Sequence, residues 1–342
     1  MQLGKTAAST CMSEMEIIRA TSYHRRDFDL AVTRTNPDDH NRVRSSLLRT
    51  ARATSSTSTL GNLQSLPLEI IYKICYLLDI RSLFNFRHVS RRAQQIVRGT
   101  RGYELVITHA LEALCVTVRT NIAPWFTLTD LFTVLCTRDC HLCGSFGGFL
   151  FLPLFTRCCF SCIREDSLPS ILLYSIVKKR VKMSSVPTVK SLPGAYSMEE
   201  IVRKRRVQIA ATEFVSRLSL YKEDEITQAT PRGRALLCYM VTTSLPYLDT
   251  ESGGIQNGIC CGGCQIALER DLASSRVKSN ACVLRDKVYS YDEFTQHFRE
   301  CPDAQNLWKL RNQGVDITNL SEFVRRGGHF KERDIIMSFN SK

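Results

Sequence analysis

Two pairs of cysteines with equal spacing constrain this chain more than any other feature of its sequence. Cys140 and Cys143 form one C-x2-C pair, and Cys159 and Cys162 form a second after fifteen intervening residues. Each pair can offer two thiolates to one tetrahedral ion, and the intervening length lets the chain return to complete the set. The spacing therefore predicts a structural zinc site with Cys140, Cys143, Cys159 and Cys162 as its ligands.

Other residues compete for places in this first site. Cys158 precedes Cys159 and can replace it, which would give a C-x3-C pair, and Cys136 and His141 are within reach of a rearranged set. A further alternative is that the thiols hold no metal, because free cysteine is commonly buried as a small apolar residue. We favour the four ligands named above because both of their pairs have the same spacing.

A second group of metal-binding residue types lies later in the chain. Cys261 and Cys264 form another C-x2-C pair, and His297 and Cys301 follow after thirty-two residues. A spacing of four places His297 and Cys301 on one face of a helical turn, which is typical of zinc fingers. We therefore expect a second structural zinc ion bound by Cys261, Cys264, His297 and Cys301.

This second site leaves alternatives open as well. Its gap is longer than in the compact fingers that read DNA, so packing of the thiols in an apolar core is the competing interpretation. Cys260 can replace Cys261 as a ligand, whereas Cys282 fits neither set. A helix over residues 289–298, with Ser290 as its cap, would carry the histidine.

The fifteen cysteines also bear on the cellular setting of the chain. A secreted protein would use them as disulfides, but no secretory signal is visible. The longest apolar stretch, residues 149–155, is far shorter than the roughly 20 residues that cross a bilayer. We expect an intracellular protein, in cytoplasm or nucleus, with reduced thiols and no membrane partner. The zinc would be structural, because four protein ligands leave no position for a reacting water.

Residues 66–99 show the pattern of three short helices. Pro67 fits the entry of the first helix, Asp79 punctuates its end, and Ser90 can cap a third helix that Gly99 ends. The first helix carries two neighbouring apolar stripes. These stripes comprise Ile70, Ile74, Leu77 and Leu78, and beside them Ile71, Cys75 and Leu78.

The apolar surface of this segment exceeds what so small a unit can bury by itself. A unit of about 40 residues has a marginal core, and a helix that is apolar on more than one face must pack against something else. The pattern alone does not decide whether a later part of the same chain or a separate partner protein buries this apolar surface.

The same segment resembles the F-box motif. The resemblance is carried by LPLEII at residues 66–71, LLDI at 77–80, SL at 82–83 and VSRR at 89–92. It implies that the helices dock onto a Skp-type adaptor, which joins a cullin scaffold and the RING subunit that recruits the ubiquitin-conjugating enzyme. One departure is Ala93, where the family often has a bulky aromatic residue. By position, the resemblance implies contacts to the adaptor or between the helices from Leu66, Pro67, Ile70, Ile74, Leu77, Leu78, Leu83 and Val89.

The cysteine-rich part extends this likeness to filamentous-fungal F-box proteins. Residues 140–162 are similar to the cysteine-rich region that follows the F-box in that group, and residues 186–197 look like its linking motif. The segments 258–265 and 297–308 are similar as well, so the likeness covers most of residues 62–314. It implies no catalytic activity, and we expect a protein that is not an enzyme.

The expected fold is mainly α, with a three-helix F-box and a mostly helical, zinc-stabilised C-terminal region that contains small irregular or β elements. The first 60 residues are poor in apolar side chains and rich in Ser, Thr and Arg, so they are assigned to a disordered tail. The predicted parts are an N-terminal tail at 1–60, the F-box at 62–102, a cysteine-rich zinc module at 103–185, a linker with a helix at 186–230, a Cys-Cys-His-Cys zinc module at 231–315 and a C-terminal tail at 316–342.

These features together indicate a substrate-recognition adaptor of a Skp–cullin–F-box ubiquitin ligase, acting on a protein substrate that the sequence does not identify. The net charge of +13 keeps an alternative open, a nuclear zinc-binding protein that contacts nucleic acid. Basic runs at residues 178–182 and 203–206 are of the type that nuclear import receptors read, but for the second run we favour the solvated face of an amphipathic helix.

Overall fold

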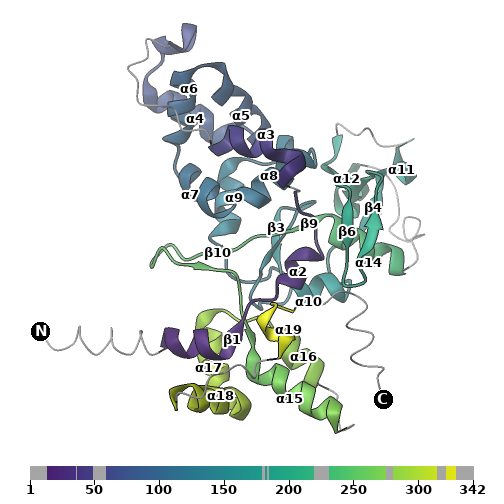
Figure 1. Cartoon of the computed structure of the whole chain (residues 1–342). Coiled ribbons are helices and arrows are strands. Elements are labelled where there is room, and N and C mark those ends of the chain that lie inside the picture. Colours follow the sequence, from purple (N-terminus) through teal and green to yellow (C-terminus); the bar gives the residue numbers. More distant parts are fainter. Residues whose placement is uncertain are drawn as a thin grey trace, which may run out of the picture. The chain divides into compact units, whose positions relative to one another are not determined.

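The computed structural model divides the chain into two compact units. Unit 1 comprises residues 1–30, 198–200 and 256–342, and unit 2 comprises residues 31–197 and 201–255. Helices predominate over short strands, which confirms the expected fold class (Figure 1). The residues that the structure describes are 14–35, 37–48, 59–178, 182, 185–218, 231–274, 280–313 and 321–328.

Three short helices of unit 2 occupy the segment that resembles an F-box. They are α4 (Leu68–Leu77), α5 (Ile80–Val89) and α6 (Arg91–Arg98), and a 3-10 turn, η1 (Gly61–Ser65), precedes them. The predicted three-helix organisation is therefore confirmed. Gly99 follows the last helix and forms its C-terminal cap, as expected.

Side-chain caps fix where two of these helices begin. The Asp79 carboxylate accepts a hydrogen bond from the backbone N–H of Ser82 at 2.9 Å at the start of α5. The Ser90 hydroxyl accepts from the backbone N–H of Ala93 at 3.1 Å at the start of α6. Both contacts satisfy a backbone donor that has no partner within the helix.

The F-box helices continue into the helices that follow them. The backbone N–H of Ile80 donates to the carbonyl of Phe126 at 2.8 Å, and Asp79 forms a β-bridge with Thr127. The first part of the cysteine-rich segment thus packs directly against α5. These following elements are α7 (Tyr103–His109), α8 (Leu111–Arg119), η2 (Ala123–Trp125) and α9 (Leu128–Leu135).

The first cysteine cluster is built on a three-stranded antiparallel sheet with the order β3-β2-β9. Its strands are β2 (Phe149–Phe151), β3 (Thr156–Cys158) and β9 (Thr242–Ser244), with α14 (Pro231–Met240) leading into the last. Residues 231–255 therefore belong to unit 2, which differs from the predicted start of the second zinc module at 231. Strand pairing over so long a separation leaves no local signal in the sequence.

The described part of the predicted linker, residues 186–218, contains the expected helix, at residues 212–218, but also short strands that were not expected. A second sheet has the order β4-β8-β5, and β6 pairs with β7 as a separate hairpin. The run 203–206 lies at and beyond the end of β7, so the amphipathic helix considered for it is wrong. The elements are β4 (Ile171–Leu173), α11 (Tyr174–Val177), β5 (Thr188–Lys190), β6 (Gly194–Tyr196), β7 (Ile201–Arg203), β8 (Gln208–Ala211) and α12 (Thr212–Leu218).

Unit 1 is a helical body around the second cysteine cluster. Strand β1 (Ser22–Tyr23) pairs antiparallel with β12 (Cys260–Cys261). Residues 14–21 are helical. The remaining helices are α2 (Arg26–Leu30), α15 (Gly262–Ala273), α16 (Ala281–Asp286), α17 (Tyr291–Glu300), α18 (Pro302–Asn312) and α19 (Glu322–Arg325).

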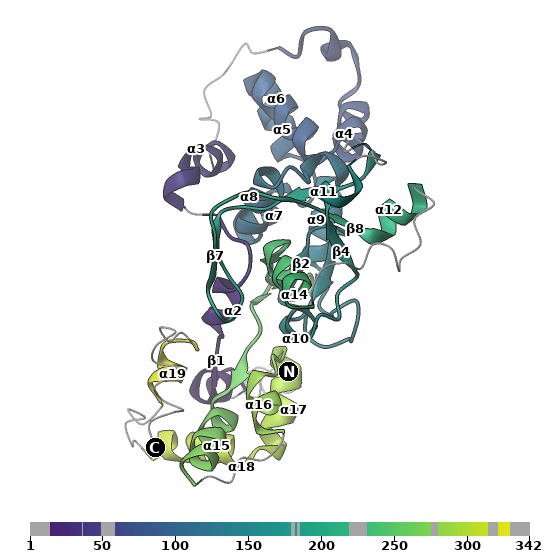
Figure 2. The same ribbon diagram turned by 90° about the vertical axis from the view of Figure 1, so that its right-hand side faces the viewer.

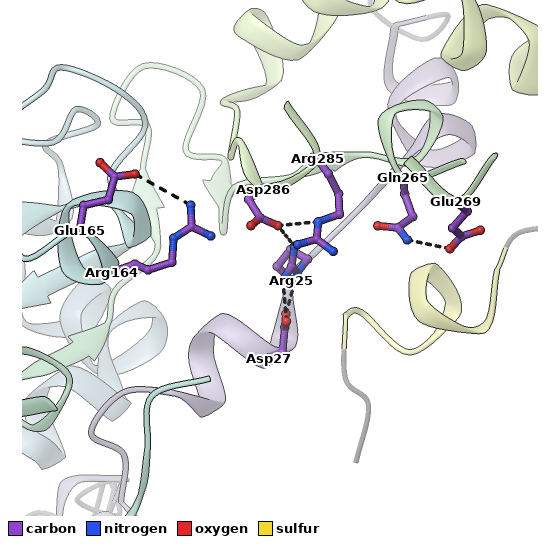
Figure 3. A network of polar contacts seen from close by, with 8 residues as sticks. All are labelled: Arg25, Asp27, Arg164, Glu165, Gln265, Glu269, Arg285 and Asp286. Atoms are coloured by element: carbon purple, nitrogen blue, oxygen red, sulfur yellow. Dashed lines mark hydrogen bonds and ion pairs between the residues drawn. The ribbon is translucent and has the colours of Figure 1, made fainter. Parts of the chain in front are cut away.

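The N-terminal segment differs from the disordered tail expected over residues 1–60. Besides β1 and α2, it contains α3 (Pro37–Leu48), a helix of unit 2. A buried ion network holds the part that contains β1 and α2. The Arg25 guanidinium donates to both carboxylate oxygens of Asp27, at 2.8 and 2.7 Å, and to Asp286 at 2.7 Å (Figure 3). Arg285 also contacts Asp286 at 2.7 Å. Arg25, which precedes α3, is thus held by Asp286, a partner more than 200 residues away that local patterns do not reveal.

Two further expectations concern parts that the structure covers incompletely. Within the described residues, no helix combines the length and apolar character that a membrane crossing requires. The basic run at 178–182 and the tail at 316–342 lie largely outside the described residues.

Candidate functional site

The first cysteine cluster brings its four predicted ligands together. The sulfurs of Cys140 and Cys162 lie 3.9 Å apart, and those of Cys143 and Cys159 lie 3.5 Å apart. All four Sγ atoms lie within 4.8 Å of one another. Sulfurs at the corners of a tetrahedron around Zn²⁺, with bonds of about 2.3 Å, are about 3.8 Å apart. The geometry is therefore that of a four-thiolate metal site.

The backbone around this cluster has the form of two tight knuckles. Gly144 lies directly after Cys143 with φ of 70°, a left-handed conformation that glycine adopts without strain. Its N–H donates to the carbonyl of Cys140 at 3.0 Å. In the second knuckle the N–H of Cys162 donates to the sulfur of Cys159 at 3.4 Å, and such contacts orient metal-binding thiolates.

The chemistry of the thiols in this cluster fits a divalent cation. A hydrogen bond from Cys159 lowers the pKa of the Cys140 thiol to about 4, whereas burial raises the pKa of the Cys162 thiol to about 12. Thiols this close cannot all ionise unless a cation neutralises them. Four thiolates are a ligand set that Zn²⁺ prefers, so the residues present fit a structural zinc ion.

The competing ligands lie outside this group. Cys158 is fully buried beside the cluster, and burial raises the pKa of its thiol well above the ordinary value. Cys136 and the exposed His141 are not among the atoms that converge. The predicted set of four is the one that the structure gathers.

The second cysteine cluster likewise gathers all four of its predicted ligands within 4.8 Å. The sulfurs of Cys261 and Cys301 lie 3.8 Å apart, and the Cys264 sulfur lies 3.4 Å from Nε2 of His297. The N–H of Cys264 donates to the Cys261 sulfur at 3.4 Å, as in the first site. Three thiols and one imidazole in this arrangement fit a tetrahedral zinc ion.

Helix α17 positions the histidine of this second cluster. Ser290 and Glu293 form a reciprocal capping box at its start, which confirms Ser290 as the predicted cap. The His297 ring stacks on the Tyr289 ring with centroids 4.8 Å apart. Cys260, the alternative ligand, is buried in strand β12 and its side chain is not part of the cluster.

One residue of the first cluster was missed by sequence reasoning. The Arg157 guanidinium is buried next to Cys158 and donates to main-chain carbonyls from three parts of unit 2. Only its position next to the cysteine pair hinted at a role. The accepting carbonyls are those of Val134 at 3.0 Å, Leu135 at 3.3 Å, Leu245 at 3.0 Å, Pro246 at 2.7 Å, and Gly147.

The first F-box helix presents one apolar face inward and another outward. Ile71 and Cys75 on α4 are buried, whereas Ile70, Ile74 and Leu77 are exposed. Leu77 retains 83% of its accessible surface. The spacing of the outward residues, 70, 74 and 77, is that of one helical stripe. Within the described residues, no other part of the chain covers this stripe.

The remaining residues predicted to contact an adaptor or another helix fall into two groups. Leu66, Pro67 and Val89 are exposed, the last at 74%. Leu83 is buried at 1% and Leu78 is half-buried, so these two contribute to packing between helices. Ala93 stands where the family often has a bulky aromatic residue. It lies in the same interior, because its side chain is fully buried within unit 2.

A small hollow of about 140 Å³ opens between η1, α4 and α6. The residues lining it are Leu60, Gln64, Leu66, Leu68, Ile71, Arg92 and Ile96.

Comparison with known proteins gives one family. Residues 63–105 match the F-box domain, a range that runs from η1 through the first turn of α7. No curated protein and no solved structure gives a significant match to the chain. The match coincides with the three helices and the exposed stripe described above. The chain therefore contains an F-box domain at residues 63–105.

Proposed function

We propose that this chain is a substrate-recognition adaptor of a Skp–cullin–F-box ubiquitin ligase. Its F-box would bind the Skp-type adaptor, and through it a cullin–RING ligase, while other parts of the chain hold a protein substrate. The F-box match supports the ligase role, because F-box proteins are typically non-catalytic adaptors. Catalysis on the ubiquitin thioester then belongs to other subunits.

The outward stripe of α4 is the single observation that carries this proposal. Ile70, Ile74 and Leu77 stay exposed although their helix buries a second apolar face. Burial of one such side chain in an interface contributes about 1.5–3 kcal/mol, so three neighbours provide a strong docking face. An amphipathic helix of this kind is a recurrent mode of recognition between proteins.

The mechanism that follows is one of proximity. Holding a substrate on the same complex as the conjugating enzyme raises the effective concentration of substrate lysines near the thioester. We further propose that both cysteine clusters hold zinc as a structural element. Each set supplies four protein ligands, so the ions would stabilise the substrate-holding parts and take no part in chemistry.

Size-exclusion chromatography with purified components tests the proposal. The chain, a Skp-type adaptor and a cullin–RING pair should elute as one complex, and omission of the adaptor should release the chain. Ile74→Glu should abolish co-elution, because it places a charge in the centre of the docking stripe.

A matched substitution controls for general damage. Ile176→Glu alters an isoleucine that is exposed to a similar degree on α11 and should leave the complex intact. Co-elution of the chain with the cullin–RING pair in the absence of the adaptor would contradict the proposal, as would equal binding by both variants.

A further inference from the structure

A cluster of arginines in unit 2 has no carboxylate partner among the residues that the structure describes. The Arg206 guanidinium donates to the carbonyls of Ser191 at 2.8 Å, Arg119 at 2.5 Å and Lys190 at 3.1 Å. These acceptors are all neutral, so they fix the side chain without neutralising its charge. Arg206 is thus a cation whose position is set in advance by the backbone.

The neighbouring Arg119, at the end of α8, has an unused donor. Its Nε is buried and has no hydrogen-bond partner among the described residues. Arg206 donates to the Arg119 carbonyl, so the two residues are adjacent, and burial and the positive charge of Arg119 both lower the pKa of Arg206. Buried donors in native proteins are nearly always paired, and two adjacent cations favour an anion between or beside them.

Three further cations extend this region. Arg203, Lys204 and Arg205 lie at and after the end of β7, and all three are exposed. Within the described residues none of them forms an ion pair. We call Arg119, Arg203, Lys204, Arg205 and Arg206 together the cationic surface.

Strand β7 gives this surface a backbone edge and an apolar contact. In the described part of the chain β7, labelled in Figure 2, pairs only with β6, so its other edge has no strand partner there. Val202 on this strand is 64% exposed. Residues 201–207 contain no aromatic side chain on which single-stranded nucleic acid would stack. An open edge with apolar and basic side chains fits an extended peptide better than a nucleic acid.

We infer that the cationic surface binds an acidic polypeptide segment, rich in Asp or Glu, which lies along β7. This inference rests on the proposed function, because such a segment would belong to the substrate that the ligase recognises. Carboxylates of the segment would pair with the exposed cations of this surface.

Fluorescence anisotropy with a labelled oligoglutamate peptide tests the inference on the full chain bound to a Skp-type adaptor. The natural chain should bind the peptide with an affinity that falls as salt rises. The triple variant Arg203→Ser, Lys204→Ser and Arg205→Ser should bind about tenfold more weakly, because three charge contacts are lost. Arg119→Gln should weaken binding as well, because it removes one positive charge beside Arg206.

A control with the same change in net charge separates a local site from general attraction. Arg299→Ser, Lys309→Ser and Arg311→Ser remove three exposed cations of unit 1, and peptide affinity should change by less than about twofold. Equal weakening by both triple variants would overturn the inference. So would tighter binding of duplex DNA than of the peptide at the same surface, or no peptide binding by the natural chain.

The outcomes also keep the two proposals apart. Absence of peptide binding by a natural chain that still co-elutes with the adaptor would overturn this inference alone. Peptide binding by a chain that never binds the adaptor would instead refute the ligase role.

Discussion

The Arg157 side chain connects the strand beside the first cysteine cluster to three other parts of unit 2. Burial lowers the pKa of this guanidinium to about 10, which leaves it charged at neutral pH. A cation held by main-chain carbonyls rather than by a carboxylate depends on every one of those contacts. Gly147 packs closely against this side chain, because a Cβ at that position would lie 2.5 Å from Cγ of Arg157. The Arg157 side chain therefore has little room to move.

Substituting this residue should therefore be costly even when the charge is kept. Arg157→Lys leaves three donors for five carbonyls, and each unpaired buried carbonyl costs about 1–3 kcal/mol. We expect a loss of about 2–5 kcal/mol in the free energy of unfolding of unit 2.

Urea unfolding followed by Trp125 fluorescence, in a Trp308→Phe background, measures this loss in unit 2. Arg138→Lys alters an exposed ion pair and should cost less than about 1 kcal/mol. Equal stability of the two variants would show that the carbonyl contacts of Arg157 contribute little.

His24 is a second residue whose protonation is set by its surroundings. Burial alone would lower its pKa, but Asp29, 2.6 Å from Nε2, outweighs burial and raises the pKa above the ordinary value. Its Nδ1 lies 3.0 Å from the carbonyl of Gly258. Both ring nitrogens thus face acceptors, and only the imidazolium can donate to both.

The stability of unit 1 should consequently depend on pH in the range of histidine titration. Because the folded pKa is raised, the stabilisation is fully present below about pH 6.5 and is lost as the pH rises through the folded pKa. The effect should stay below about 1 kcal/mol, since 33% of the His24 side chain is exposed.

Urea midpoints reported by Trp308, in a Trp125→Phe background, check this between about pH 6 and pH 9. His24→Asn should remove the decrease. A natural chain whose midpoint rises with pH over this range would contradict the assigned sign.

At the scale of elements, the F-box helices could be read from the sequence because their signals are local. Asp79, Ser90 and Gly99 mark helix ends through contacts within a few residues. The cysteine pairs were readable for the same reason, since a C-x2-C knuckle is closed by its own backbone. The pairing of β1 with β12 and of β2 with β9 could not be read, because each joins segments separated by about a hundred residues or more in sequence.

The N-terminal segment shows the same limit. Its poverty in apolar residues predicted disorder, but buried ion pairs and strand pairing to distant residues supply the missing contacts. Such partners become visible only once the chain is folded.

Helix α17 allows a prediction at this scale, because its capping box precedes the histidine of the second cluster. Ser290→Ala removes a cap worth about 1 kcal/mol and frees the first turn, so His297 should hold its metal less tightly. Competition with a zinc chelator should remove one ion faster from this variant than from the natural chain.

Ser274→Ala supplies the control, because Ser274 lies at the end of α15 and contacts only its own helix. Identical zinc release by Ser290→Ala and the natural chain would mean that the cap does not support the site.

For the whole molecule, metal content is the broadest test. Each unit gathers one four-ligand cluster, so the purified chain should contain about two zinc ions. Structural zinc supplies about 10 kcal/mol or more of binding free energy, so loss of an ion should unfold its unit. Cys143→Ser should contain about one ion by elemental analysis.

Two buried cysteines outside the clusters serve as matched controls. Cys158→Ser and Cys260→Ser should both retain about two ions, since neither side chain belongs to a ligand set. Loss of one ion from Cys158→Ser but not from Cys159→Ser would show that the first site uses the alternative ligand.

The central claim is that the F-box of this chain binds a Skp-type adaptor through the outward apolar face of α4. Calorimetric titration of the adaptor into the natural chain, into Leu77→Glu and into the control Leu310→Glu tests it most directly. The natural chain and the control should bind with about micromolar affinity or tighter, changing little with salt, and Leu77→Glu should bind about a hundredfold more weakly. No binding by the natural chain, or equal binding by Leu77→Glu, would contradict the account.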